Sequence, residues 1–215
     1  MKAYYPMFAD LRGRPCLVIG GGLIAQRKVT TFLSYGAQVT VISPTVTKRL
    51  AAYAKQGRIR HLARRATVRD VQGVWMVCAA TNDEAINRLV SDAAHRRKIF
   101  ANIVDQTPLC SFIAPAIFRR GPLTIAVSTS GASPSLAKRL RSELGARVGS
   151  EYVPMLRLLT SLRGVAKQRL PSYGDRKRYF DRLVRSRVFD LVRLGRVGPA
   201  RREALDLLAK EAERS

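Results

Sequence analysis

The most specific chemical pattern in the sequence is a glycine triplet near the N-terminus. Gly20, Gly22 and Ala25 fit the spacing G-x-G-x-x-A, which binds the pyrophosphate of a dinucleotide when it joins a strand to a helix. The first glycine permits a tight turn, the second lets phosphates approach the backbone, and the alanine lets the helix lie close to the strand. The pattern predicts dinucleotide binding at a helix N-terminus, and an ordinary strand-to-helix turn is the alternative.

The usual second marker of such a site is missing. Many dinucleotide-binding units carry an acidic residue at the end of the second strand, where it binds the adenosine ribose. This chain has Ser43 there. Serine can hydrogen-bond a ribose, but without a carboxylate a 2′-phosphate is excluded less firmly, and Lys48 or Arg49 could even favour one. The residues therefore favour NAD over NADP only modestly.

Asp105 is the strongest single candidate, because it directly follows the run 99–104, in which five of six residues are apolar. That run predicts a buried strand, and open α/β sheets bind ligands at the carboxyl ends of their strands. The segment Asp-Gln-Thr-Pro is also good turn sequence, so a structural aspartate is the alternative. His61 and His95 have no partner at the spacing of a metal site or catalytic triad, and we expect both to be solvated or incidental.

A run of hydroxyl side chains precedes a predicted helix start at Ser133-Pro134. Ser128, Thr129 and Ser130 offer hydroxyls and backbone amides ahead of a helix N-terminus, which suits a carboxylate or a phosphate. A plain capping loop is the competing interpretation.

The elements that must position these residues alternate between strands and helices. The patterns predict strands at 16–19, 38–42, 58–64, 74–80 and 99–104, and helices at 23–34, 45–56 and 83–97. This order indicates an α/β fold with a Rossmann-like, doubly wound parallel sheet over residues 1–112.

The pattern changes after the fifth strand. A hairpin with strands at 112–118 and 123–127 and a helix at 133–147 form a second segment, 113–150. Residues 151–215 are predicted to be an all-helical C-terminal domain, with helices at 153–170, 175–194 and 199–213.

Composition restricts the class of protein. The chain has 215 residues, 47% of them hydrophobic and 25% charged, which is typical of a globular protein and excludes a wholly disordered one. No apolar run is long enough to span a bilayer and the N-terminus lacks a signal peptide, so we expect a cytoplasmic protein. Cys16, Cys78 and Cys110 lack metal-site or disulfide spacing and are expected to be buried, reduced thiols.

The net charge of +24 predicts a polyanionic partner. Charge alone does not separate nucleic acid from an acidic metabolite.

Over about residues 4–145 the sequence resembles the precorrin-2 dehydrogenase family of sirohaem synthesis. The resemblance rests on separate motifs that occur in the family's order. They are Tyr4-Tyr5-Pro6-Met7-Phe8, Cys16 to Ala25, Arg27-Lys28, Val41-Ile42-Ser43-Pro44, Ala79-Ala80-Thr81-Asn82-Asp83, Asn102-Ile103-Val104-Asp105, Phe112-Ile113-Ala114-Pro115-Ala116, and Ser128-Thr129-Ser130-Gly131-Ala132-Ser133-Pro134.

The resemblance implies an NAD-dependent oxidation of precorrin-2 to sirohydrochlorin, followed in some relatives by insertion of Fe²⁺ to give sirohaem. It implies a homodimer in which residues 113–150 make the subunit contact. It also implies roles for single residues: Gly20, Gly22, Leu23 and Ile24 at the pyrophosphate, Ser43 and Pro44 at the adenosine end, Thr81 in the cofactor cleft, and Asp105 in dehydrogenation and, in bifunctional members, chelation. Serine in place of the ribose acid is usual in this family.

The substrate that the resemblance implies agrees with the charge. Precorrin-2 is a macrocycle with eight carboxylates, which a basic cleft would concentrate and orient. Besides the hydroxyls of Ser128, Thr129 and Ser130, the candidates for its carboxylates are Arg119, Arg120, Lys138 and Arg141. Asp105 is the best-placed carboxylate to take a proton during hydride transfer. Histidine is scarce, so we expect no histidine-based metal site, and we expect the chain to lack the methyltransferase domain of trifunctional relatives.

Two other functions stay open. A dinucleotide-sensing regulator would bind nucleic acid through its basic helical tail, although that tail shows no helix-turn-helix pattern. A chelatase that has lost its dehydrogenase activity is the other. The sequence does not decide between a sirohaem and a cobalamin-type pathway.

Overall fold

The computed structural model describes residues 3–214, which form two compact units. The first, here called the sheet unit, comprises the described residues up to Ala114 together with 130–133. The second, the helical unit, comprises 115–129 and the described residues from Pro134 onward. No helix among residues 3–214 is both long enough and apolar enough to span a membrane.

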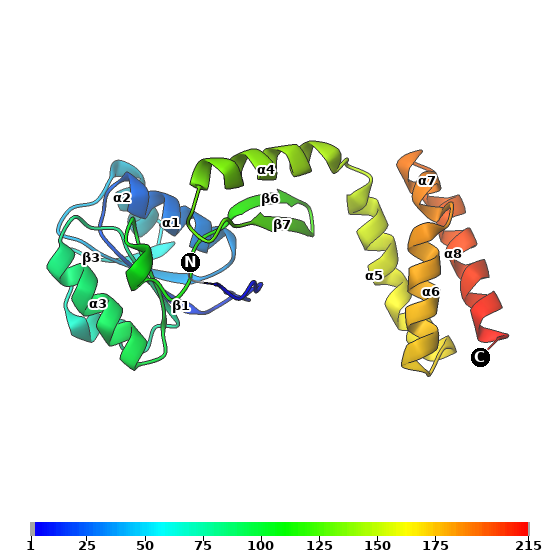
Figure 1. The fold of residues 1–215 in the computed structure, drawn as a ribbon, viewed down its shortest axis with the longest axis horizontal. Helices are drawn as coiled ribbons and strands as arrows, with labels where there is room; N and C mark the ends of the chain where they lie inside the picture. The colour runs from blue at the N-terminus through cyan, green and yellow to red at the C-terminus, as the bar shows by residue number, and fades with distance from the viewer. Residues whose placement is uncertain (1–2, 215) are drawn as a thin grey trace. The chain divides into compact units, whose positions relative to one another are not determined.

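The sheet unit is a doubly wound parallel sheet, as the sequence predicted (Figure 1). Its strand order is β3-β2-β1-β4-β5, and all four pairings are parallel. The strands are β1 (Pro15–Ile19), β2 (Gln38–Ile42), β3 (Ile59–Leu62), β4 (Met76–Ala79) and β5 (Phe100–Ile103). The helices are α1 (Leu23–Ser34), α2 (Lys48–Lys55) and α3 (Glu84–Arg96), with short 3-10 turns η1 (Val68–Val71) and η2 (Thr107–Leu109).

Helices cover both faces of this sheet, which explains why its strands are almost continuously apolar. Side chains of β1 alternate between two cores, because successive residues of a strand point to opposite faces. Val18 packs with α1 and α2 residues, whereas Leu17 packs with α3 residues. The apolar period of 3.6 in each helix supplies the matching stripe.

The helical unit begins with an antiparallel hairpin, β6 (Ala116–Arg120) and β7 (Leu123–Val127), and α4 (Pro134–Arg147) packs on it. A Cβ on Gly145 would lie 2.6 Å from the Phe118 ring, so only glycine allows this approach of α4 to β6. The remaining helices are α5 (Tyr152–Arg169), α6 (Tyr173–Arg185), α7 (Val188–Arg193) and α8 (Val197–Ala212) (Figure 1). Buried residues of all four helices form a third core.

The first hairpin strand lies further along the chain than predicted. It spans 116–120 and not 112–118, because Phe112 is bound to the edge of β5. The Phe112 N–H donates to the Ala101 carbonyl, and the Phe112 carbonyl accepts from Asn102 Nδ2 at 3.2 Å. The turn is then the two residues Gly121 and Pro122, and the positive φ of Gly121, 56°, suits the first position of a type II′ turn.

Two helix predictions were also wrong in their extent. The expected helix at 175–194 is two helices, because Ser186 ends one and begins the next: its Oγ donates to the Leu183 carbonyl and accepts from the Val188 N–H. The helix expected at 45–56 begins at Lys48, since Thr47 caps it by accepting from the Leu50 N–H.

A buried carboxylate joins α6 to α8. The Glu211 side chain is only 4% exposed and accepts from Arg178 Nε at 3.1 Å and Arg182 Nη1 at 2.8 Å. The hydrogen bond from Arg178, followed by that from Arg182, lowers the pKa of Glu211 below its usual value. This pairing ties together helices that are distant in sequence.

Candidate functional site

The predicted cofactor residues lie where β1, β2 and β4 of the sheet unit end, and Asp105 follows the end of β5. The parallel ladder continues one residue past each strand: the backbone N–H of Gly20 donates to Ile42, that of Ala80 to Ile19, and that of Val104 to Ala79, at 2.8–2.9 Å. From β1 the chain continues to β2 and β3 on one side of β1, and then crosses to β4 and β5 on the other side. Open α/β sheets bind ligands where the strand order reverses in this way, here between β1 and β4. The edge of the sheet formed by the carboxyl ends of these strands is here called the crest. Neighbouring strands are about 4.8 Å apart, which puts the ends of β2 and β5 about 14 Å from each other along the crest.

Each glycine of the triplet has a different surrounding. A Cβ on Gly20, whose φ is 110°, would lie 2.2 Å from the Ala80 carbonyl oxygen. A Cβ on Gly21 would lie 1.9 Å from the Thr45 carbonyl oxygen. A Cβ on Gly22 would meet no atom within 4 Å. Gly22 is also the N-cap of α1 and has no side-chain cap, so the open space lies at the positive end of a helix. The arrangement fits a dinucleotide pyrophosphate.

The loop after β2 is bound to this turn. The Thr47 N–H donates to the Gly21 carbonyl at 3.0 Å, and Thr47 Oγ1 donates to Gln26 Oε1 at 2.6 Å. Ser43 therefore lies beside Gly21, with its Oγ 2.9 Å from where a Cβ on that glycine would be. Pro44 follows it and is exposed.

We expected His61 to be solvated or incidental, but in the structure it supports this loop. Its Nε2 donates to the Ser43 carbonyl at 2.9 Å, from the neighbouring strand β3. Lys48 and Arg49 are exposed at the start of α2, but Arg49 Nε donates to the Tyr53 hydroxyl at 2.9 Å and this bond lowers the pKa of Tyr53. The guanidinium that could have favoured a 2′-phosphate is thus directed to a tyrosine.

Thr81 lies in the loop between β4 and α3 and is held on both sides. Its Oγ1 accepts from the Asp83 N–H at 3.0 Å, and its carbonyl accepts from Asn87 Nδ2 at 3.1 Å. Asn87 is 2% exposed, and its Oδ1 has no hydrogen-bond partner within residues 3–214. Sequence reasoning missed Asn87, although a polar residue on the apolar face of a helix was a usable signal.

Asp105 lies in the turn that follows β5. Its side chain is exposed and its φ is 59°, a left-handed conformation that aspartate adopts more readily than most residues. The carboxylate therefore points away from the core. Gly131, from the predicted hydroxyl loop, lies against Thr107 two residues further on, where an added Cβ would be 3.4 Å from Thr107 Cγ2.

A second polar centre that the sequence did not reveal lies under this turn. Asn102 of β5 is buried, its Oδ1 accepts from Lys28 Nζ at 3.0 Å, and its Nδ2 donates to the Phe112 carbonyl. The network joins α1 to β5 and orients the chain that enters and leaves the Asp105 turn.

The thiols are buried as predicted. Cys16, Cys78 and Cys110 are free, and burial raises the pKa of both Cys16 and Cys78 to about 11. Cys110 Sγ accepts from the Ile103 N–H at 3.2 Å. His95 is exposed but bonded within α3, where its Nδ1 donates to the Ser91 carbonyl at 2.8 Å.

The candidates for substrate carboxylates lie mainly in the helical unit. Arg119 and Arg120 end β6, and the Arg120 guanidinium lies 5.5 Å from the centre of the Phe118 ring. Lys138 is exposed on α4, whereas Arg141 is half-buried and its Nε has no hydrogen-bond partner in the described chain. Ser128 and Thr129 belong to the helical unit, and Ser130 to the sheet unit.

Comparisons with known proteins agree with this architecture. An NAD(P)-binding family model matches residues 7–116, a sirohaem biosynthesis central model matches 120–147, and a sirohaem synthase dimerisation model matches 151–208. The solved structure of SirC, precorrin-2 dehydrogenase, superposes with a TM-score of 0.71 and 32% identity, over 96% of this chain and 99% of SirC. The chain belongs to the precorrin-2 dehydrogenase family of sirohaem synthesis. Its N-terminal part is therefore an NAD(P)-binding domain, as the glycine triplet predicted.

Longer relatives carry the same family region. Siroheme synthase 1 of Serratia proteamaculans is 39% identical over 200 residues, which are 93% of this chain and 42% of the relative. Siroheme synthase of Photobacterium profundum is 35% identical over 204 residues, 95% of this chain and 44% of the relative. The chain thus spans less than half the length of these relatives.

Proposed function

We propose that this chain oxidises precorrin-2 to sirohydrochlorin with NAD as the electron acceptor. The observation that carries the proposal is the sheet crest: an open glycine turn at a helix start, and an exposed aspartate two strands away, in a chain that matches SirC over nearly all of its length. The reaction removes two electrons and two protons from the macrocycle. NAD held at the glycine turn would supply the hydride acceptor, and the second proton would go to a base of this chain.

Different residues of the crest bind different parts of the cofactor. The backbone at Gly20, Gly22, Leu23 and Ile24 binds the pyrophosphate, and Leu23 and Ile24 are exposed at the first turn of α1. Ser43 and Pro44 bind the adenosine end, and Thr81 lines the cleft beside β4. Arg49 is bonded to Tyr53, which supports NAD over NADP.

Asp105 is the proposed base. Its carboxylate is exposed at the end of β5, and general-base catalysis by a positioned carboxylate contributes about 10²–10⁴-fold to a rate. In bifunctional relatives the same residue would assist removal of pyrrole protons during insertion of Fe²⁺, and whether this chain inserts iron stays a prediction.

The substrate's carboxylates are proposed to bind Arg119, Arg120, Lys138 and Arg141, with the hydroxyls of Ser128, Thr129 and Ser130. Arg141 supports this most directly, because its buried Nε is a donor that has no partner in the described chain and is costly to leave unpaired. A carboxylate would satisfy it with a charge-assisted hydrogen bond.

We also propose a homodimer, supported by the match of 151–208 to a dimerisation region. The division of the chain into 1–112, 113–150 and 151–215, and the subunit contact through 113–150, stay proposals.

The test is anaerobic turnover of precorrin-2 with NAD, in which the formation of sirohydrochlorin is measured by its absorbance. Asp105→Asn removes the base and keeps a residue that tolerates a positive φ, so we expect turnover to fall by about 10²–10⁴-fold with NAD binding unchanged. Asp105→Ala should behave likewise in turnover. Asp92→Asn, an exposed carboxylate of α3, is the matched control and should retain activity. Full turnover by Asp105→Asn would remove Asp105 from the mechanism.

A further inference from the structure

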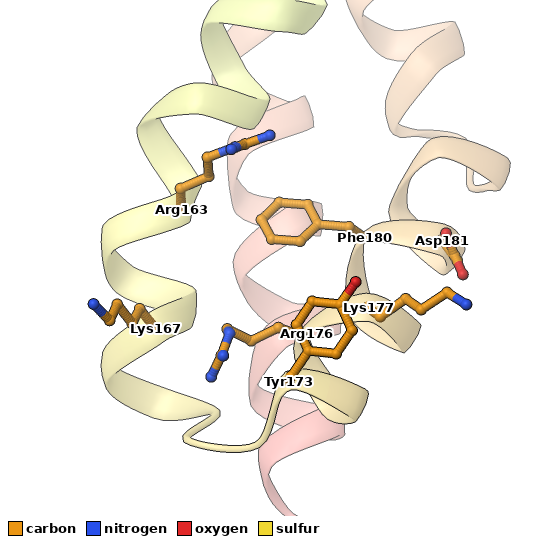
Figure 2. Close-up of a pocket in the computed structure, with 7 residues that line it drawn as sticks. All are labelled: Arg163, Lys167, Tyr173, Arg176, Lys177, Phe180 and Asp181. Atoms are coloured by element: carbon orange, nitrogen blue, oxygen red, sulfur yellow. The ribbon is translucent and has the colours of Figure 1, made fainter.

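The helical unit contains a basic cavity of about 400 Å³ between α5 and α6 (Figure 2). Two stripes of side chains line it. One stripe on α6 has the helical spacing i, i+3, i+4, i+7, and the other on α5 has the spacing i, i+4, so each stripe occupies one helix face. The lining residues are Tyr173, Arg176, Lys177 and Phe180 from α6 with Arg163 and Lys167 from α5, and Asp181 at the rim.

The cations of this cavity differ from two neighbouring arginines of α6, Arg178 and Arg182. Arg178 and Arg182 are paired with Glu211, and Arg178 also with Asp175. The four cations of the cavity form no ion pair within residues 3–214, and Asp181 is the one carboxylate among the lining residues. Several positive charges held close together repel each other, and an anionic ligand would remove that cost.

The cavity also offers flat apolar surface. Figure 2 shows the Tyr173 and Phe180 rings between the two helices, with Arg163 reaching from α5 toward Phe180 and Lys167 turned outward at the rim. Arg176 is fixed, because its Nη1 donates to the carbonyls of Leu170 and Pro171 at the end of α5. Tyr173 is 76% exposed in the single chain.

Cations around aromatic rings fit a flat ligand whose edge carries carboxylates. We infer that the α5–α6 cavity is an additional site, distinct from the carboxylate contacts proposed above, that binds the polycarboxylate tetrapyrrole through carboxylate contacts to its arginines and lysines and through stacking on Tyr173. The identity of the ligand rests on the proposed function, and the ionic chemistry rests on the cavity itself. A volume of about 400 Å³ accommodates part of such a macrocycle, so the rest would remain outside the cavity.

The test measures binding of uroporphyrin, a stable octacarboxylate macrocycle, to the full chain without NAD. Arg163→Gln/Lys167→Gln removes two exposed cations of the cavity, and we expect affinity to fall by about five- to thirty-fold. Arg157→Gln/Arg193→Gln removes the same charge from exposed positions of α5 and α7 and should leave affinity within about two-fold. Tyr173→Ala should weaken binding by about five-fold or more through lost stacking, whereas Tyr5→Ala, also highly exposed, should not.

Hydrogen exchange then locates the site. Uroporphyrin should protect the amides of residues 163–181 in the wild-type chain and fail to do so in Arg163→Gln/Lys167→Gln. The inference is overturned by equal losses in both double variants, by protection confined to other segments, or by equal protection of 163–181 with inorganic phosphate or duplex DNA at the same concentration. Because no turnover is involved, failure of the proposed dehydrogenation would leave this result unchanged, and failure here would leave turnover intact.

Discussion

Two adjacent glycines of the cofactor turn should respond in opposite ways to the same substitution. In Gly21→Ala the new Cβ would be 1.9 Å from the Thr45 carbonyl oxygen, whereas a Cβ atom essentially never lies closer than 3.0 Å to an atom that is not its neighbour in the chain. The loop after β2 must therefore move by about 1 Å, against the bond from the Thr47 N–H to the Gly21 carbonyl. Forced overpacking of this kind costs about 2 kcal/mol, which lowers the Tm of a chain of this size by about 4–8 °C.

Gly22→Ala introduces the same methyl group into open space. Its φ of −80° suits alanine, so the free energy of unfolding should change by less than about 0.5 kcal/mol. The methyl group would, however, stand where the pyrophosphate approaches the backbone. Loss of one charge-assisted hydrogen bond from a backbone N–H should weaken NAD binding by about 10- to 100-fold.

Thermal unfolding and NAD titration of both variants separate the two effects. Gly22→Ala should unfold like the wild-type chain and bind NAD poorly, while Gly21→Ala should unfold at lower temperature. The reasoning is refuted if Gly22→Ala binds NAD with wild-type affinity, or if Gly21→Ala is as stable as the wild-type chain.

Three further predictions concern stability and reactivity. A hydrogen bond from Arg64 lowers the pKa of Asp70 to about 2, so its stabilisation is complete above about pH 4 and is lost as the pH falls through 2. Asp70→Asn should therefore lower the free energy of unfolding, measured with urea, by about 1–2 kcal/mol at pH 7. This difference from the wild-type chain should become smaller below about pH 4, and a difference that does not change with pH would contradict the prediction. Glu211→Gln should lower the free energy of unfolding by about 1–2 kcal/mol, because it weakens the pairing with two arginines, and unchanged denaturant midpoints would show that pairing to be unimportant. Cys16 and Cys78, with pKa values of about 11, should resist a thiol reagent at pH 8 in the native chain and react only after denaturation, and rapid native labelling would place them at the surface.

Patterns that depend on near neighbours in the chain could be predicted from the sequence. The bounds of α1 and β2 were predicted correctly, because a glycine turn, an apolar stripe and a β-branched run are local signals. The parallel sheet followed from the alternation of strands and helices, which leaves few allowed topologies. The cofactor turn could also be predicted. Glycine is required at Gly20 because the backbone after the neighbouring strand β4 lies so close, but the motif has a fixed spacing that is visible in the local sequence.

Other features were decided only by contacts between distant parts of the chain. The sequence pattern predicted Phe112 to be part of the hairpin, but its hydrogen bonds to Ala101 and Asn102 place it at the edge of β5. His61 became a support for Ser43 only because β3 pairs with β2. A local pattern records what a residue prefers, whereas a hydrogen bond or a buried donor depends on which partner the fold brings near, and that information is absent from the residue's own neighbours. The turn residues of the cofactor site were thus determined by sequence, and the bonds that hold them in place by tertiary structure.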